Sequence, residues 1–96
     1  MQRLEERLSR RYLVRGRVQA VGFRDFTQRL ARRLEVTGWV RNGPDGRTVE
    51  AVATGMPVAM EAFEHGIRQG PPGAVVTEFT AEDYPKVDMD SFEVRF

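Results

Sequence analysis

The stretch YLVRGRVQAVGFRDFTQRLARRLEV, residues 12–36, decides the fold because its hydrophobic pattern changes partway along. Residues 12–18 are rich in β-branched and aromatic side chains, which predicts a strand with one face made by Tyr12, Val14 and Val18. A short glycine-containing segment follows, after which apolar side chains recur every three or four residues, at Phe23, Phe26, Leu30 and Leu34. That spacing predicts an amphipathic helix over about residues 23–35.

The next segments predict two strands joined by a tight connection. Residues 36–41 are rich in β-formers, and NGPDG at residues 42–46 combines the residue types that favour a turn. The apolar side chains of residues 47–53 alternate, so one side of that strand would carry Val49, Ala51 and Ala53. We therefore predict that these two strands form a hairpin.

A second helix and two further strands complete the chain. Pro57 suits a first helical turn, and the apolar stripe that follows it consists of Met60, Phe63 and Ile67. The GPPG run at residues 70–73 ends this helix. Beyond it the sequence predicts a strand at residues 75–80, an acidic loop at 82–90, and a last strand marked by the alternation of Phe92, Val94 and Phe96.

The order of these elements predicts an α+β fold. Strand, helix, strand, strand, helix, strand, with one extra strand at the end, is the ferredoxin-like split β-α-β pattern. We expect a sandwich in which an antiparallel sheet of four to five strands carries two helices on one face. Residues 11–96 would form this single domain. Residues 1–10 would be an N-terminal extension that lengthens the first strand, forms a short helix around Leu4 and Leu8, or stays disordered.

Composition excludes several classes of function. The 96-residue chain has no cysteine and a single histidine, so it can form neither a disulfide nor a metal site built from several histidines. No apolar run reaches the ~18–20 residues of a membrane helix, and the charged start of the chain lacks the apolar centre of a signal peptide. We therefore expect a cytoplasmic protein with no membrane partner.

Charge is distributed unevenly along the chain. Residues 1–41 contain eleven arginines and four acidic residues, a net charge of +7, whereas residues 42–96 contain four basic and ten acidic residues, a net charge of −6. Arginine matches phosphate and carboxylate groups with its planar fork, so the basic half suggests an anionic ligand. On composition alone, a solvated surface with one basic and one acidic face is the simpler interpretation.

The connection between the first strand and the first helix is the first candidate site. The first turn of a helix leaves backbone N–H groups without partners, and these donors together with the helix dipole attract an anion. The helix begins near Gly22, and Arg24 falls in its first turn, where a positive side chain is locally unfavourable. An anion held between the N–H groups and the Arg24 guanidinium would explain this arrangement, and a solvated arginine is the alternative.

Asn42 is the second candidate. It stands where the second strand meets the turn, and asparagine is common there because its side chain bonds to nearby backbone. In a split β-α-β unit, however, the first and second strands are parallel with one strand between them, so their carboxyl ends lie at the same edge of the sheet. Asn42 and the 17–24 loop would then face each other across one shallow pocket.

Two motifs in these segments resemble those of a known family. GRVQAVGFR at residues 16–24 is similar to the acylphosphatase signature, a glycine and a basic residue followed by VQGV-x-FR. GWVRN at residues 38–42 is similar to the second signature, Gly-aromatic-Val-basic-Asn. DGRTVEAVATG at residues 45–55, the GPPG run and the closing FEVRF also fit, so the resemblance covers roughly residues 10–96.

The resemblance implies a reaction and a set of roles. Acylphosphatases hydrolyse an acyl phosphate to a carboxylate and inorganic phosphate, without a metal or organic cofactor. Arg24 would correspond to the phosphate-binding arginine, and Asn42 to the asparagine that positions the attacking water. The loop that cradles the phosphate with backbone N–H groups would correspond to Gln19, Ala20, Val21, Gly22 and Phe23.

That chemistry suits the residues present. A carboxylate is a good leaving group, and phosphoryl transfer depends mainly on positioning and charge stabilisation. Arg24 and the loop N–H groups can supply the charge stabilisation. Asn42 is no strong base, but its carbonyl can accept a hydrogen bond from a water placed in line with the phosphorus.

The sequence departs from the family pattern at two positions. Ala20 stands where the family has a loop glycine, and if that position needs a positive φ, alanine would cost on the order of 1 kcal/mol and weaken phosphate binding. The stretch from Asn42 to Val49 is one residue longer than usual, with Thr48 as the apparent extra. A bulge or a longer turn would absorb it. Neither departure removes Arg24 or Asn42.

Two other functions stay open at this point. RNA-recognition domains share the order of strands and helices, but they stack bases on sheet aromatics, which the RGRV and TVEAV strands lack. The other alternative is a catalytically weak acylphosphatase-like interaction module, which Ala20 favours. We expect a monomer that takes a small-molecule acyl phosphate as substrate, releases inorganic phosphate, and has no nucleic-acid partner.

Overall fold

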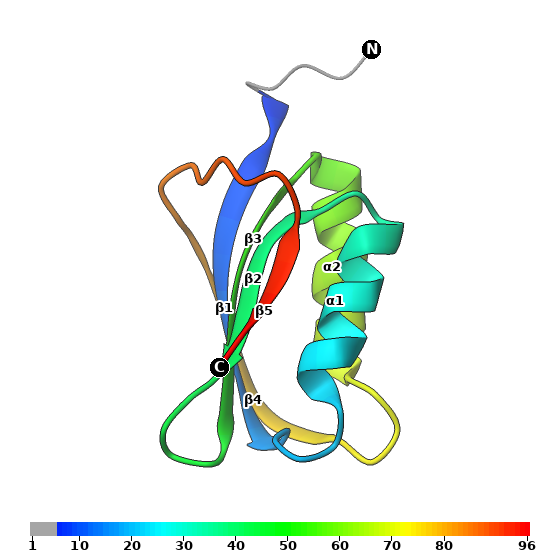
Figure 1. Ribbon diagram of the computed structural model, residues 1–96, viewed down its shortest axis with the longest axis vertical. Coiled ribbons are helices and arrows are strands. Elements are labelled where there is room, and N and C mark those ends of the chain that lie inside the picture. The colour runs from blue at the N-terminus through cyan, green and yellow to red at the C-terminus, as the bar shows by residue number, and fades with distance from the viewer. Residues whose placement is uncertain (1–5) are drawn as a thin grey trace.

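Two helices lie against one face of a five-stranded sheet in the computed structural model, which describes residues 6–96 (Figure 1). The strands lie in the order β4-β1-β3-β2-β5. Along the chain the elements are β1 (Leu8–Arg17), α1 (Phe23–Arg33), β2 (Thr37–Asn42), β3 (Thr48–Gly55), α2 (Pro57–Gln69), β4 (Val75–Asp83) and β5 (Phe92–Arg95). The α+β ferredoxin-like fold expected from the sequence is confirmed. Neither described helix is long and apolar enough to cross a lipid bilayer.

The central strand β3 determines where the two candidate segments meet. It pairs antiparallel with β1 on one side and with β2 on the other. As a result, β1 and β2 run in the same direction, as predicted. The loops that follow them, residues 18–22 and 43–47, lie at the same end of the sheet, the lower end in Figure 1.

The sheet differs from the prediction in its fifth strand and in two strand lengths. β5 pairs parallel with β2, so the sheet is mixed rather than wholly antiparallel. β4 continues to Asp83, beyond the predicted end at residue 80, because its backbone stays paired with β1 as far as Arg10 opposite Asp83. The acidic loop therefore begins after Asp83 instead of at residue 82. β1 begins at Leu8, so residues 8–10 lengthen the first strand, and residues 1–5 of the expected extension lie outside the described residues.

The buried face of the first helix, α1, is narrower than the apolar stripe that the sequence predicted. Its buried residues are Phe23, Thr27 and Ala31, whereas Phe26, Leu30 and Leu34 are only half-buried. Small side chains face inward, and the Thr27 hydroxyl donates to the Phe23 carbonyl at 2.8 Å, which satisfies its buried oxygen. The second helix buries the three residues that the sequence predicted, Met60, Phe63 and Ile67.

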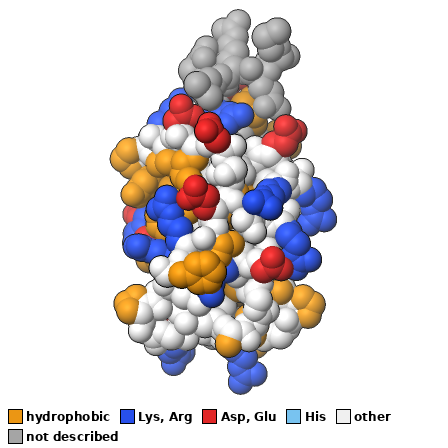
Figure 2. Space-filling view, viewed as in Figure 1, with side chains coloured by type: hydrophobic (Ala, Val, Ile, Leu, Met, Phe, Trp, Pro, Cys, Tyr) orange, Lys and Arg blue, Asp and Glu red, His pale blue; other side chains and the backbone are white. Residues whose placement is uncertain are grey.

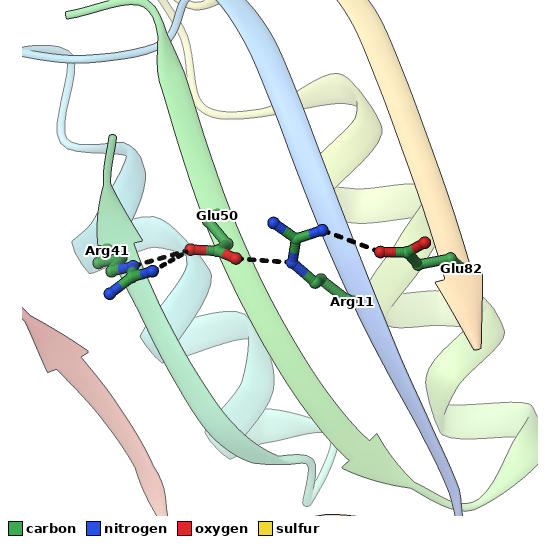
Figure 3. A network of polar contacts seen from close by, with 4 residues as sticks. All are labelled: Arg11, Arg41, Glu50 and Glu82. Atoms are coloured by element: carbon green, nitrogen blue, oxygen red, sulfur yellow. Dashed lines mark hydrogen bonds and ion pairs between the residues drawn. The ribbon is translucent and has the colours of Figure 1, made fainter. Parts of the chain in front are cut away.

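Ion pairs cross four adjacent strands on the sheet face away from the helices (Figure 3). Arg41 contacts Glu50 at 2.7 Å, Glu50 accepts a hydrogen bond from Arg11 at 2.6 Å, and Arg11 reaches Glu82 at 2.9 Å. Burial alone would raise the pKa of Glu50, but the hydrogen bonds from Arg11 and Arg41 outweigh it and hold that pKa below its ordinary value. Glu50 therefore stays ionised and links its own strand, β3, to the neighbouring strands β2 and β1.

Candidate active site

The loops after β1 and β2 border a pocket of about 320 Å³. This volume is at the lower end of the range for small-molecule sites. The lining comes from the β1–α1 loop, the first turn of α1, the end of β2 and the last strand: Val18, Ala20, Gly22, Phe23, Arg24, Asp25, Asn42, Val94 and Phe96. The two candidate residues that the sequence singled out, Arg24 and Asn42, therefore line one pocket.

The loop before α1 leaves several backbone donors without a protein partner. Gly22 caps the helix with φ 76°, a left-handed conformation that glycine adopts without strain. Ala20 is also left-handed, with φ 62°. Within the described part of the chain, the backbone amides of residues 20–25 donate to no backbone carbonyl outside the helix. A helix start with free N–H groups is suited to binding an anion.

Arg24 is held by the end of the chain's last strand. Its Nη1 donates to the Arg95 carbonyl at 3.2 Å. The Cζ atom lies 4.5 Å from the centroid of the Phe96 ring, within cation–π distance. These two contacts limit the positions of a long side chain that lines the pocket. These contacts of the protein itself therefore partly order the guanidinium.

Among the described residues that line the pocket, Asp25 is the acidic one. Its carboxylate pairs with Arg29, one helical turn later, at 3.1 Å. Arg29, Arg32 and Arg33 are exposed, and basic side chains gather on the side of the molecule where α1 lies (Figure 2). The positive charge around α1 offsets the carboxylate next to Arg24, which favours an anionic ligand.

The connection after Asn42 is ordered by its own hydrogen bonds. Gly43 N donates to the Thr48 carbonyl at 2.8 Å and closes the hairpin. Asp45 accepts hydrogen bonds from the Thr48 hydroxyl at 2.6 Å and from the backbone N–H of Arg47 at 2.9 Å. Both bonds, the hydroxyl's first, lower the pKa of Asp45. The carboxylate therefore clamps the turn.

The extra residue between Asn42 and Val49 is absorbed by the longer turn. Asn42 still pairs directly with Val49, and the β2–β3 register runs without a shift from there to Thr37 opposite Thr54. Thr48 itself pairs with Arg15 of β1. Of the two possibilities, a bulge or a longer turn, the structure therefore shows the turn, and Asn42 keeps its place at the end of β2.

The predicted site residues divide into two groups. Ala20, Gly22 and Phe23 line the pocket together with Arg24 and Asn42. The Gln19 side chain instead reaches the turn after β2, and Val21 packs against the hydrophobic core. Neither of the latter two is part of the described pocket lining.

The sequence prediction missed Val18, Asp25, Val94 and Phe96 as lining residues. The last two reach the site because β5 pairs parallel beside β2, a placement that alternation of apolar residues does not reveal. Asp25 could have been found from its position next to Arg24. Within residues 6–96, no three His, Asp or Glu side chains are grouped so that they could hold a metal ion.

Comparison with known proteins agrees with this arrangement. The family model described as Acylphosphatase matches residues 10–94. The chain belongs to the acylphosphatase family. An acylphosphatase of Synechococcus sp. strain JA-2-3B'a(2-13) is 48% identical over 82 residues, which cover 85% of this chain and 86% of that protein.

Solved acylphosphatase structures have the same fold. The acylphosphatase of Coxiella burnetii superposes with a TM-score of 0.92 at 32% identity and covers 99% of both chains. That of Bacillus subtilis superposes with a TM-score of 0.87 at 36% identity, over 93% of this chain and 99% of the other. The likeness therefore extends over nearly the whole domain, including both loops that border the pocket.

Proposed function

We propose that this acylphosphatase hydrolyses acyl phosphates in the pocket between the start of α1 and the end of β2. Arg24 and the backbone amides of residues 19–24 would hold the phosphoryl group, and Asn42 would position the attacking water. The observation that carries the proposal is that Arg24 and Asn42, from different elements, line one pocket beside free N–H groups.

The reaction follows from these groups. The water oxygen attacks phosphorus, the bond from phosphorus to the acyl oxygen breaks, and the carboxylate leaves with the bonding electron pair. Arg24 and the amides stabilise the charge on the phosphoryl oxygens in the transition state. Asn42 accepts a hydrogen bond from the water and orients its lone pair. We assign the water's proton to an oxygen of the phosphate, which leaves as inorganic phosphate.

The conformation of Ala20 favours catalysis over an idle interaction module. Its φ of 62° is the backbone conformation that a loop glycine would adopt. The substitution has therefore kept the loop in a left-handed shape, and the amides on either side of Ala20 stay without backbone acceptors among the described residues. The cost of the alanine falls on folding stability instead of on the geometry of the site.

The test is the hydrolysis of benzoyl phosphate, with inorganic phosphate as inhibitor and with EDTA present and absent. Arg24→Gln should lower kcat/KM by at least ~100-fold and weaken phosphate inhibition as well. Arg33→Gln is the matched control, because Arg33 is exposed at the far end of the same helix. Normal turnover in Arg24→Gln, or a rate that EDTA abolishes and added metal restores, would contradict the proposal.

Asn42→Ala separates binding from water positioning. Turnover should fall by at least ~10-fold, while the inhibition constant of inorganic phosphate stays within about twofold, because Arg24 and the amides remain. An equal loss of turnover and phosphate binding would mean that Asn42 holds the phosphate instead of the water.

The proposal also includes a monomeric, cytoplasmic enzyme. The lack of cysteine is compatible with a reducing compartment. The edge strand β4 exposes Glu78, Glu82 and Asp83, and charged residues on an edge oppose pairing with a second sheet. Sedimentation at increasing protein concentration tests the monomer, and a concentration-dependent dimer would overturn it.

A further inference from the structure

The Gln19 side chain joins the phosphate loop to the turn after Asn42. Its Nε2 donates one hydrogen bond to the Gly43 carbonyl and another to the Thr48 carbonyl, each at 2.9 Å. An amide nitrogen carries two hydrogens, so both donors are used. Gln19 is half-buried, and the two bonds hold its amide in one orientation.

The two acceptors lie next to the residue pair that contains Asn42, both on its turn side. Gly43 follows Asn42 directly, and Thr48 precedes Val49, the residue paired with Asn42 across the hairpin. Among the described residues, the carboxylate of Asp45 accepts hydrogen bonds from Arg47 and Thr48, both in the hairpin that also carries Asn42. Gly16 N donates to the Arg47 carbonyl at 3.0 Å, but Gly16 belongs to β1 and precedes the phosphate loop. Gln19 is thus the described side chain that ties this loop to the strand end bearing Asn42.

We propose that Gln19 is a positioning residue that sets the place of Asn42 relative to the bound phosphoryl group. The inference rests on the proposed function, because it needs Arg24 and the loop to hold phosphate and Asn42 to orient water. The side chain of Gln19 acts through Asn42, since it bonds to main-chain carbonyls and is not part of the described pocket lining.

The expected kinetic signature is a loss in turnover without an equal loss in binding. Misplacement of a reacting group by 1 Å can cost on the order of 100-fold in rate. Arg24 has contacts of its own, the Arg95 carbonyl and the Phe96 ring, and does not depend on the two carbonyls that Gln19 holds. Loss of its hydrogen bonds should therefore lower kcat more than it raises KM or the phosphate inhibition constant.

The experiment compares Gln19→Met with Gln28→Met in benzoyl phosphate hydrolysis. Gln28 is a matched control, because its Nε2 also donates to a main-chain carbonyl, that of Phe92 at 3.0 Å, and it is likewise half-buried but is not part of the pocket lining. Gln19→Met should lower kcat at least about tenfold, with KM and the phosphate inhibition constant within about threefold of the unmodified protein. Gln28→Met should leave all three constants unchanged.

Other results overturn the inference in distinct ways. If Gln19→Met keeps the kcat of Gln28→Met, or loses phosphate binding in step with kcat, Gln19 does not act through Asn42. If Gln19→Met fails to fold while Gln28→Met folds, Gln19→Asn, which keeps the amide on a shorter stem, replaces it. Failure of that variant too would make Gln19 a folding requirement and overturn the positioning role. Full activity in Arg24→Gln and Asn42→Ala would instead refute the proposed function itself.

Discussion

Ala20→Gly should stabilise the protein, although it removes a methyl group. Ala20 has a φ of 62°, a conformation in which an L-residue with a Cβ is strained. The side chain is exposed, so its removal leaves no cavity in the core. The folded chain therefore carries this strain, and glycine would relieve it.

The expected change in the free energy of unfolding is the difference between two backbone effects. Relief of the left-handed strain is worth roughly 1–2 kcal/mol, and the extra freedom of glycine in the unfolded chain takes back roughly 0.4–1 kcal/mol. We expect the free energy of unfolding to rise by about 0.5–1 kcal/mol. For a domain of this length, that corresponds to a Tm increase of roughly 2–8 °C.

Thermal unfolding followed by circular dichroism measures the change in Tm. A second measurement on the same variant gives the phosphate inhibition constant in benzoyl phosphate hydrolysis. The inhibition constant should stay within about twofold, because glycine adopts the same left-handed φ that Ala20 has and the loop keeps its shape. Gly46→Ala is the matched reverse test. Gly46 has φ 75°, and a Cβ there would meet no atom within 4 Å, so only the backbone conformation is penalised.

Gly46→Ala should lower the free energy of unfolding by about as much as Ala20→Gly raises it. A lower Tm for Ala20→Gly, or a Gly46→Ala variant as stable as the unmodified protein, would refute the reasoning. A several-fold tightening of phosphate binding in Ala20→Gly would show instead that the alanine distorts the site.

Three other substitutions test separate parts of the structure. The folded-state pKa of Glu50 lies below its unfolded value, so the contribution of Glu50 to stability is complete at neutral pH. This contribution is lost as the pH falls from about 4.3 through the lower folded-state pKa. Glu50→Gln should therefore lower the free energy of unfolding by roughly 1–3 kcal/mol at pH 7 and flatten the acid side of a stability–pH curve. Thr54→Val removes a buried hydroxyl that bonds with Ser9 Oγ at 2.6 Å, and urea titration should show a loss of roughly 1–3 kcal/mol with kcat unchanged. Phe96→Leu removes the ring beside Arg24 and should weaken phosphate inhibition roughly two- to five-fold with an unchanged Tm, because Phe96 is fully exposed.

Local pattern was sufficient to predict most of the fold. The second helix buries the three apolar residues of its predicted stripe and stops at Gly70, whose φ of 73° suits the helix end. In α1 the same reasoning was only partly right. Phe23 is buried as predicted, but Phe26 and Leu30 are only half-buried, and the small Thr27 and Ala31 take the next inward positions. Helix periodicity alone does not tell which edge of an apolar stripe packs most tightly.

The site was predictable where the chain order determines it and unpredictable where pairing across the sheet does. Arg24 lies after β1 and Asn42 ends β2, and these two strands flank β3, so topology alone brought the two residues to one edge. Phe96 enters the pocket through the parallel pairing of β5 with β2, which depends on the whole sheet. The two side-chain hydrogen bonds of Gln19 could not be predicted for the same reason, because their acceptors lie on the hairpin and not in its own segment.

The insertion of β3 between β1 and β2 also determines when the site can exist during folding. Tyr12 pairs with Ala51 across β1 and β3, and Arg11 reaches Glu82 on β4, contacts that join distant parts of the chain. Such long-range contacts form slowly compared with helices. Until β3 has docked on both neighbours, Arg24 and Asn42 have no common edge. Recovery of catalysis during refolding should therefore lag behind the return of helical signal and report completion of the sheet.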